Sequence, residues 1–465
     1  MFRPMTVLQK VFVLFAFLAT GALVFRLPVP AFAAEKQIRI GVAVNETRGT
    51  LSSSGTMNFR DADGKNLSLK GSVPLSIDRS GNSVIVGKAS LRLPVEVTGA
   101  RLLRWGNHPY RGTLRLVRGR KGFTVVNILG VENYLRGVLK MEVNPAWEFE
   151  VLKAQAIVAR TYALRNLGKH GSEGYDLCAL PHCQVYRGVN AEDARLTKAI
   201  EATKGIVVST GSGELAFTPY HADSGGYTAN VADVWGGNIP YLASRPEPFD
   251  YESPYSNWQV SLGLQEIEEA LKPRGLNVGN VTEIRVLSTD RAGRAVYVGI
   301  VGDRGRAKMK ASHFRMALGS SKIKSTFFTI ESSRPTRLQN EGIPLPEGDG
   351  PALTTTYDER ALTAMIERGV FSSDEMMDML LNPGKRGDYL RLALKRQSGV
   401  RPEKQVAQVA PKGVSSGNVT IRGKGWGHGV GMSQWGAKKM AEEGWDYRKI
   451  IAHYYPTTQL KRLYR

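Results

Sequence analysis

The sequence predicts an α+β protein, in which mixed, largely antiparallel β-structure packs around a buried central helix and a helical insertion interrupts the core. Over residues 37–138, short runs rich in β-branched residues alternate with turn signals such as Asp63-Gly64, which is typical of strands. The first strong helix signal, at 147–167, is apolar on nearly every side and therefore indicates a buried helix. Asn144-Pro145, a favoured cap followed by a favoured first residue, is expected to begin this helix.

The composition excludes some classes of protein. Of 465 residues, 42% are hydrophobic and 23% charged, so the chain is not wholly disordered. Two cysteines cannot staple a chain of this length, which excludes a disulfide scaffold. With 63 Lys and Arg against 42 Asp and Glu, the formal net charge is +21. Such a charge predicts a polyanionic partner, which could be nucleic acid, an anionic membrane or an acidic polymer.

The first 33 residues are expected to be a signal peptide. Arg3 and Lys10 precede an apolar run over 11–25, and small residues lead to a cleavage site near Ala33. The run is about 15 residues long, whereas a membrane-spanning helix needs roughly 20. An uncleaved anchor is the alternative, and it would be the chain's contact with a membrane. Cleavage would remove three bases and no acid, leaving a formal charge of about +18. We therefore expect an exported protein of the cell envelope, in periplasm or wall, with wall polymers rather than nucleic acid as partners.

The remaining chain divides by composition. A β-rich region is expected over 34–125 and a mixed core over 126–337 and 418–465. The segment 338–417 combines a Gly-, Pro- and acid-rich stretch, short amphipathic helical patterns and a Lys/Gln/Pro/Ser-rich linker, so it is interpreted as a helical insertion on flexible joints. Glycine then occupies every second position from Gly423 to Gly431, which predicts an extended segment whose bare face allows close approach by a ligand or a neighbouring element.

Glu142 is the first candidate for chemistry. It lies between an apolar segment and the central helix, five residues before Trp147. A carboxyl group held against an aromatic ring and away from water can have a raised pKa and donate a proton. The nearby helix N-terminus opposes this effect by favouring the charged form, and a capping or surface glutamate is the alternative. Zinc-protease, nucleophile-elbow and phosphate-loop signatures are absent from the sequence.

A second candidate site gathers His170, Cys178, His182 and Cys183 within 14 residues. Two thiolates and two imidazoles are a sufficient set of ligands for a tetrahedral zinc ion. A Cys178–Cys183 disulfide is the competing interpretation in an exported protein, and unpaired buried thiols are a third. Four protein ligands would leave zinc no open position, which favours a structural over a hydrolytic metal.

Polar and aromatic residues suited to sugars gather around Ser224 and Tyr227, beside the glycine pair Gly225-Gly226. A plain glycine-rich turn explains the same residues equally well.

On the central helix, Lys153 and Arg160 are seven residues apart and so share a face. Charged groups on a buried helix need partners, which could be a substrate's acidic groups or buried acids of the protein.

Taken together, these segments resemble the stage II sporulation protein D family (SpoIID/LytB-like). The similarity runs in order over roughly 100–337 and 418–465, and it is carried by NYLRGV (133–138), Glu142 with PAW (145–147), LKAQA (152–156), ARTYA (159–163), CQVY (183–186), SGGYT (224–228), FR (314–315), LG (318–319), GWGHGVGMSQWGA (425–437) and YYP (454–456).

The resemblance implies peptidoglycan glycan strands as substrate and lytic transglycosylase activity, with Glu142 as the single acid/base. One carboxyl group suffices for such a reaction, because the sugar's own C6 hydroxyl closes a 1,6-anhydro ring without external water. Candidate substrate-binding residues are Lys153, Arg160, Ser224, Tyr227, Trp426, His428 and Gln434. The resemblance also favours structural zinc at His170, Cys178, His182 and Cys183.

The chain departs from the family pattern in two places. The insertion has no counterpart, and Pro145 follows Glu142 by three residues where other members have two. A rival function, also associated with LytB-like relatives, is a non-catalytic wall-binding activator of a cell-wall amidase. It would keep the basic surface and the sugar groove but would not need Glu142.

Overall fold

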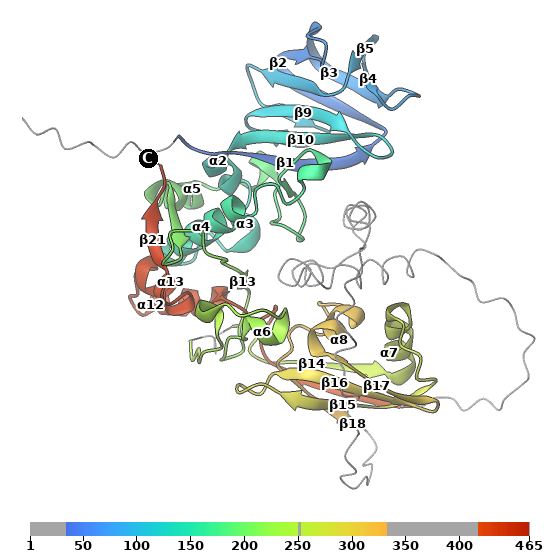
Figure 1. Cartoon of the computed structure of the whole chain (residues 1–465). Coiled ribbons are helices and arrows are strands. Elements are labelled where there is room, and N and C mark those ends of the chain that lie inside the picture. The colour runs from blue at the N-terminus through green and yellow to red at the C-terminus, as the bar shows by residue number, and fades with distance from the viewer. Residues whose placement is uncertain (1–33, 250–252, 333–416, 465) are drawn as a thin grey trace, which may run out of the picture.

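The computed structural model describes residues 34–249, 253–332 and 417–464. It is an α+β structure, as the sequence predicts, with a large β-region, a helical middle and a second β-region following one another from top to bottom in Figure 1. The expected signal peptide and nearly all of the expected helical insertion lie outside the described residues. No helix within the described ranges is both long enough and apolar enough to cross a bilayer.

The N-terminal region is an 11-stranded sheet with the main order β11-β1-β10-β9-β6-β2-β3-β4-β5, to which β7 and β8 are attached through β2. Neighbours are antiparallel except for the β1–β11 pair. Buried and more exposed residues alternate along the strands, so that one face of the sheet packs into the core. In β9, for example, Leu114 and Leu116 are fully buried between more exposed residues. The strands are β1 (Gln37–Glu46), β2 (Arg48–Arg60), β3 (Asn66–Ile77), β4 (Ser83–Val86), β5 (Ala89–Arg92), β6 (Val95–Gly99), β7 (Leu103–Trp105), β8 (His108–Tyr110), β9 (Thr113–Arg118), β10 (Phe123–Gly130) and β11 (Leu177–Cys178).

The sequence predicts β-structure up to about residue 138, but the last strand of this stretch, β10, ends at Gly130. The prediction is therefore wrong for residues 131–138. Two short helices follow, α2 (Val131–Arg136) and α3 (Leu139–Glu142). Val131, Tyr134 and Leu135 are fully buried, and their spacing of three and four residues places them on one helical face. The apolar positions therefore match a helix here, and Glu142 is the last residue of α3.

The predicted central helix is α4 (Phe149–Arg165), and it is buried on two sides. One face, including Leu152 and Ala156, packs into the core beneath the N-terminal sheet. Another, including Val151 and Ile157, packs into a second core with the C-terminal helices. The helix starts later than expected, since the Asn144 side chain accepts a hydrogen bond from the Ala146 amide (2.9 Å) and closes a turn instead.

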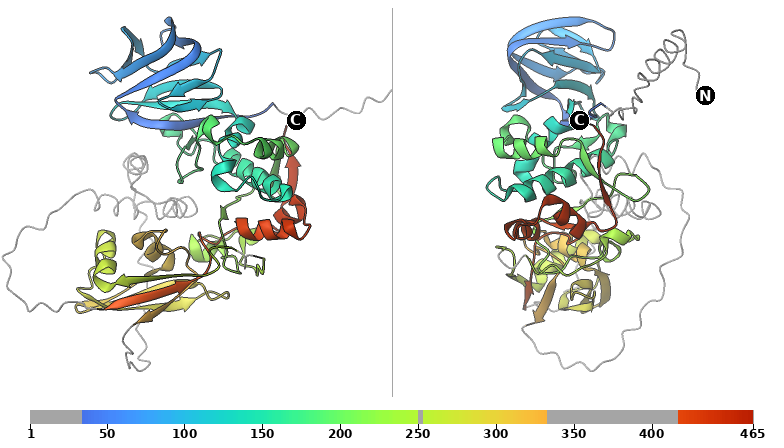
Figure 2. Two further views of the ribbon diagram at one scale, coloured as in Figure 1. Left: turned by 180° about the vertical axis from the view of Figure 1, so that it is seen from behind. Right: turned by 90° about the vertical axis from the view of Figure 1, so that its left-hand side faces the viewer.

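The second β-region is formed by two three-stranded sheets with their own core, covered by two helices (Figures 1 and 2). Here β19 (Asn418–Gly423) lies between β14 (Trp258–Gly263) and β18 (Phe328–Ser332), so the C-terminal segment completes this sheet. The other elements are β15 (Val281–Thr289), β16 (Ala295–Gly302), β17 (Gly305–Lys310), α7 (Leu264–Leu271) and α8 (Ala311–Leu318).

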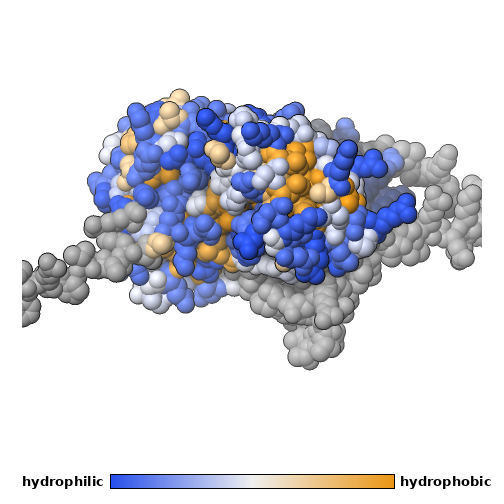
Figure 3. All heavy atoms as spheres, turned by 90° about the horizontal axis from the view of Figure 1, so that it is seen from above, coloured by the Kyte–Doolittle hydropathy of each residue, from blue (hydrophilic) through white to orange (hydrophobic). Residues whose placement is uncertain are grey.

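The C-terminal segment also enters the helical middle. There β20 (Met432–Ser433) pairs with β13 (Tyr220–His221) and β21 (Gln459–Arg462) pairs with β12 (Ile206–Ser209). Helices α5 (Ala194–Ala202), α6 (Val231–Val234), α12 (Gln434–Glu442) and α13 (Tyr447–Tyr454) complete this part. Seen from above, the molecule presents a mostly hydrophilic face interrupted by apolar patches (Figure 3).

Candidate functional site

A pocket of about 250 Å³ lies in the helical middle, and Glu142 contributes the sole carboxylate among the described residues that line it. Its walls come from segments far apart in sequence: the end of α3, α4, the loop after β11, β13, α6 and the glycine-rich C-terminal motif. The lining residues are Glu142, Tyr162, Pro181, His182, Cys183, Gln184, Val185, Pro219, Tyr220, Trp235 and His428.

Burial changes the chemistry of Glu142. Removal from water raises the pKa of its carboxyl group to about 7, while a hydrogen bond from Tyr220 acts in the opposite direction. A carboxyl group that titrates near neutrality can exchange a proton in both directions at physiological pH, as a general acid/base must. The residue remains partly exposed, and so does its neighbour Met141.

The predicted sugar-binding residue His428 also lines the pocket. Burial, reinforced by Arg315 and Arg294, lowers the pKa of His428 to about 3, so the ring is neutral. Its Nδ1 accepts a hydrogen bond from the Val430 amide (3.0 Å). The ring also hydrogen-bonds to the backbone of Tyr220, so His428 supports the wall that carries Tyr220.

The glycine-rich motif is not the extended segment that the sequence predicts. Gly427 and Gly431 have φ of +123° and +73°, so the backbone turns rather than forming a strand. Close approach is nevertheless the reason for glycine here. A Cβ at Gly431 would lie 2.1 Å from the carbonyl oxygen of Pro219, and one at Gly427 would lie 2.6 Å from the Cβ of His221. The motif thus packs directly against β13.

The four predicted metal ligands come together. One ligand atom from each of His170, Cys178, His182 and Cys183 lies within 4.8 Å of every other. His170 Nε2 is 3.3 Å from His182 Nδ1, and the three sulfur–nitrogen contacts measure 3.4–3.5 Å. Tetrahedral zinc with ordinary bond lengths would place two nitrogens about 3.3 Å apart and a nitrogen and a sulfur about 3.6 Å apart. The cluster could therefore hold a metal ion. Although His182 and Cys183 are neighbours in sequence, the side chains of both lie within the cluster.

One histidine of the cluster is hydrogen-bonded to a carboxylate, as metal-bound histidines usually are. His170 Nδ1 lies 2.6 Å from Glu173 Oε1, which fixes the ring with Nε2 facing the cluster. Both cysteines are free thiols rather than a disulfide. Since His182 and Cys183 also line the pocket, the cluster and the Glu142 pocket share a wall.

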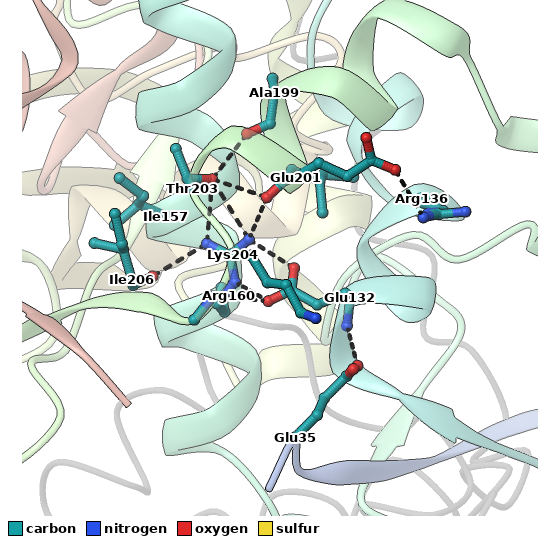
Figure 4. A network of polar contacts seen from close by, with 12 residues as sticks. Glu35, Glu132, Arg136, Ile157, Arg160, Ala199, Glu201, Thr203, Lys204 and Ile206 are labelled. Carbon is teal, nitrogen blue, oxygen red and sulfur yellow. Dashed lines mark hydrogen bonds and ion pairs between the residues drawn. The ribbon is translucent and has the colours of Figure 1, made fainter. Parts of the chain in front are cut away.

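Arg160 lies away from the pocket, in a buried network. Its side chain is fully buried, and Nε and Nη2 bond to the two oxygens of Glu132 at 2.9 and 2.7 Å (Figure 4). Nη1 donates to the carbonyl oxygen of Ile206 (3.1 Å). Of the two partners that the sequence left open, a substrate's acidic group or a buried acid of the protein, the structure places Arg160 beside a buried acid.

Lys153 and Gln434 are also engaged within the protein. Lys153 Nζ lies 2.6 Å from Glu150 Oε1, close to the rings of Phe149 and Tyr447. Gln434 is buried and donates to Gln155 Oε1 at 3.4 Å. Neither residue lines the pocket.

Ser224, Tyr227 and Trp426 belong to a neighbouring loop cluster. Arg294, nearly fully buried, donates to the backbone carbonyls of Ser224 and Tyr227 and so fixes their loop. Trp426 pairs by backbone hydrogen bonds with Asp223, and its ring meets Tyr255 edge-on at 4.5 Å. These residues shape the surroundings of the pocket and do not line it.

Tyr220, Gln184 and Trp235 also line the pocket, although their sequence motifs did not predict this. Gln184 lies in the CQVY motif, and Tyr220 and Trp235 lie in the polar and aromatic stretches around Ser224. Their motifs were visible, but their convergence on Glu142 depends on long-range pairing that no local pattern records.

Part of this site lies within a segment that matches a known family. Residues 119–209, which carry Glu142 and all four cluster residues, match the family described as Stage II sporulation protein (SpoIID). This part of the chain is therefore similar to the SpoIID family.

Named relatives extend the similarity beyond that segment. An amidase enhancer of Bacillus subtilis (strain 168) is 29% identical over 326 residues, covering 70% of this chain but 40% of its own length. A stage II sporulation protein D of Bacillus amyloliquefaciens is 22% identical, covering 71% of this chain and 74% of its own. An uncharacterised protein of Brachyspira hyodysenteriae is 24% identical, with 74% and 70% covered. The chain thus spans less than half the length of the amidase enhancer.

Proposed function

We propose that this protein is an exported lytic transglycosylase that cleaves peptidoglycan glycan strands. The observation that carries the proposal is Glu142: a carboxyl group with a pKa of about 7 in a pocket whose described lining offers no second carboxylate. Ordinary glycosidases use a pair of carboxyl groups, whereas a single one suffices when the sugar supplies its own nucleophile.

Glu142 has two successive tasks in this reaction. As the acid it protonates the glycosidic oxygen, and the C1–O bond breaks. As the resulting carboxylate it takes the proton of the C6 hydroxyl group, whose oxygen bonds to C1 and closes the 1,6-anhydro ring. The proton balance returns Glu142 to its starting state, and a pKa near 7 suits both steps.

A structural metal ion accompanies the proposal. We expect zinc bound by His170, Cys178, His182 and Cys183 to fix the pocket wall that His182 and Cys183 form, with no open position for substrate. Elemental analysis of the purified chain should find about one zinc per chain. The Cys183→Ser variant should lose most of it, and a chain without zinc would contradict this expectation.

The experiment incubates purified sacculi with wild-type protein and Glu142→Gln, followed by mass analysis of the products. Wild type should release anhydro-ended fragments, and the variant should release them at least about 100-fold more slowly, since it lacks the proton donor. Glu148→Gln is the matched control, because Glu148 precedes α4 and does not line the pocket. Undiminished anhydro product from Glu142→Gln would exclude the proposal.

A second candidate is suggested by the printed name of one relative, the amidase enhancer. In that function the protein would bind the wall and activate an N-acetylmuramoyl-L-alanine amidase without cleaving glycan itself. Sacculi incubated with the protein and a cell-wall amidase would then lose stem peptides faster, equally with wild type and Glu142→Gln, and no anhydro ends would form.

A further inference from the structure

A chain of hydrogen bonds leads from the protein interior to Glu142. The hydroxyl group of Tyr134 donates to Gln184 Oε1 at 3.1 Å, and Gln184 Nε2 lies 3.2 Å from the hydroxyl group of Tyr220. Tyr220 and Glu142 line the same pocket, and hydrogen bonding from Tyr220 lowers the pKa of the Glu142 carboxyl group. We propose that Tyr220 is a positioning residue for Glu142, with its hydroxyl group oriented by Gln184 so that it donates to the carboxylate.

The direction of these hydrogen bonds follows from one backbone carbonyl. Gln184 Nε2 also lies 3.4 Å from the carbonyl oxygen of Ala159, which can only accept. The amide nitrogen must therefore face both Ala159 and Tyr220, and Oε1 must face Tyr134. Because Gln184 donates to the oxygen of Tyr220, the proton of that hydroxyl group is left for Glu142.

The backbone of Tyr220 is held from two sides. It pairs with Met432 in the parallel β13–β20 ladder, and the His428 ring bonds to its backbone. The preceding residue, Pro219, meets Gly431 so closely that no side chain would fit there. The glycine-rich motif therefore has a role in this inference: it fixes the strand that carries Tyr220.

This inference rests on the proposed function, in which Glu142 gains negative charge as it releases its proton. A hydrogen bond donated by Tyr220 strengthens as that charge develops, so it stabilises the transition state more than the bound substrate. The titratable groups near Glu142 come from several elements: Tyr220 on β13, Tyr134 on α2, Tyr162 on α4, His182 and Cys183 after β11, and His428 in the C-terminal motif.

The test measures the titration of Glu142 directly. Full-length protein labelled with ¹³C at the glutamate carboxyl carbon is titrated by NMR, and Glu142→Gln identifies the signal. In Tyr220→Phe the carboxylate loses a donor, so its apparent pKa should rise by about one unit. With glycan strands, kcat should fall about tenfold with little change in KM, and the alkaline limb of the pH profile should move up by about the same unit.

Tyr162→Phe is the matched control, since Tyr162 lines the same pocket but its hydrogen bond goes to Lys169, and it should leave the Glu142 titration in place. Gln184→Leu should raise the pKa in the same direction by a smaller amount, because the Tyr220 hydroxyl group loses its orientation. An unchanged Glu142 titration in folded Tyr220→Phe would overturn the inference. The NMR measurement needs no activity, so it remains decisive even if the wild type releases no anhydro product and the proposed function fails.

Discussion

Two glutamates ten residues apart, Glu132 on α2 and Glu142 at the end of α3, show how partners decide what a carboxyl group can do. Both oxygens of Glu132 are engaged, with Arg160 at 2.7 and 2.9 Å, the amide of Gly205 at 3.0 Å and the hydroxyl group of Tyr464 at 2.7 Å. Glu142 is held by Tyr220 and faces a pocket, where burial raises its pKa to about 7. The first arrangement engages both carboxyl oxygens within the protein, whereas the second leaves the carboxyl group facing a pocket.

The comparison also explains the position of Arg160, a predicted site residue. Arg160 is a predicted substrate-binding residue, yet its guanidinium group pairs with Glu132 and does not line the pocket. A cation beside Glu142 would favour the carboxylate and remove the proton donor. The pairing of Arg160 with Glu132 therefore keeps this positive charge away from the proposed proton donor.

The largest expected effect comes from breaking the Glu132 network. Arg160→Ala should lower the free energy of unfolding by about 3–5 kcal/mol, because it leaves a buried carboxylate without its cation. Urea unfolding monitored by circular dichroism measures the loss. Arg136→Ala is the matched control: Arg136 pairs with the exposed Glu201 at 3.2 Å, and losing such a surface pair should cost less than about 1 kcal/mol. Equal losses in the two variants would contradict the contrast.

A smaller effect is expected from Glu142, and it depends on pH. Because folding raises the pKa of Glu142 from 4.5 to about 7, the folded state holds a proton that the unfolded chain has released between these values. Wild type should therefore lose stability relative to Glu142→Gln as the pH rises from about 4.5 to 7, by something on the order of 2 kcal/mol. Urea titrations at four or five pH values measure this difference, and parallel curves for the two proteins would show that Glu142 is not protonated by burial.

Local patterns were sufficient for much of the fold. The β-branched runs of the N-terminal region and the apolar character of residues 147–167 indicated the right kinds of element, and α4 lies within two residues of the predicted helix at each end. They were insufficient where tertiary contacts decide. The period of two in the glycine repeat predicted an extended segment, but the backbone turns at Gly427 and Gly431, where it packs against His221 and Pro219.

The candidate site divides in the same way. Its ligand cluster lies within 14 residues and could be recognised from composition, as could the possibility of a proton donor at Glu142. The environment that raises the pKa of Glu142 could not be predicted, because Tyr220 and His428 reach the pocket through the pairing of β13 with β20, more than 200 residues apart.

That pairing has a consequence for the order in which the protein becomes competent. A chain synthesised or transported from its N-terminus presents Glu142 early, but the wall formed by His428 and the strand that fixes Tyr220 arrive only with the segment from residue 418 onward. Until that segment folds back between β14 and β18 and onto β13, the acid lacks its enclosure. The topology thus delays the pocket until the segment from residue 418 onward has folded into place.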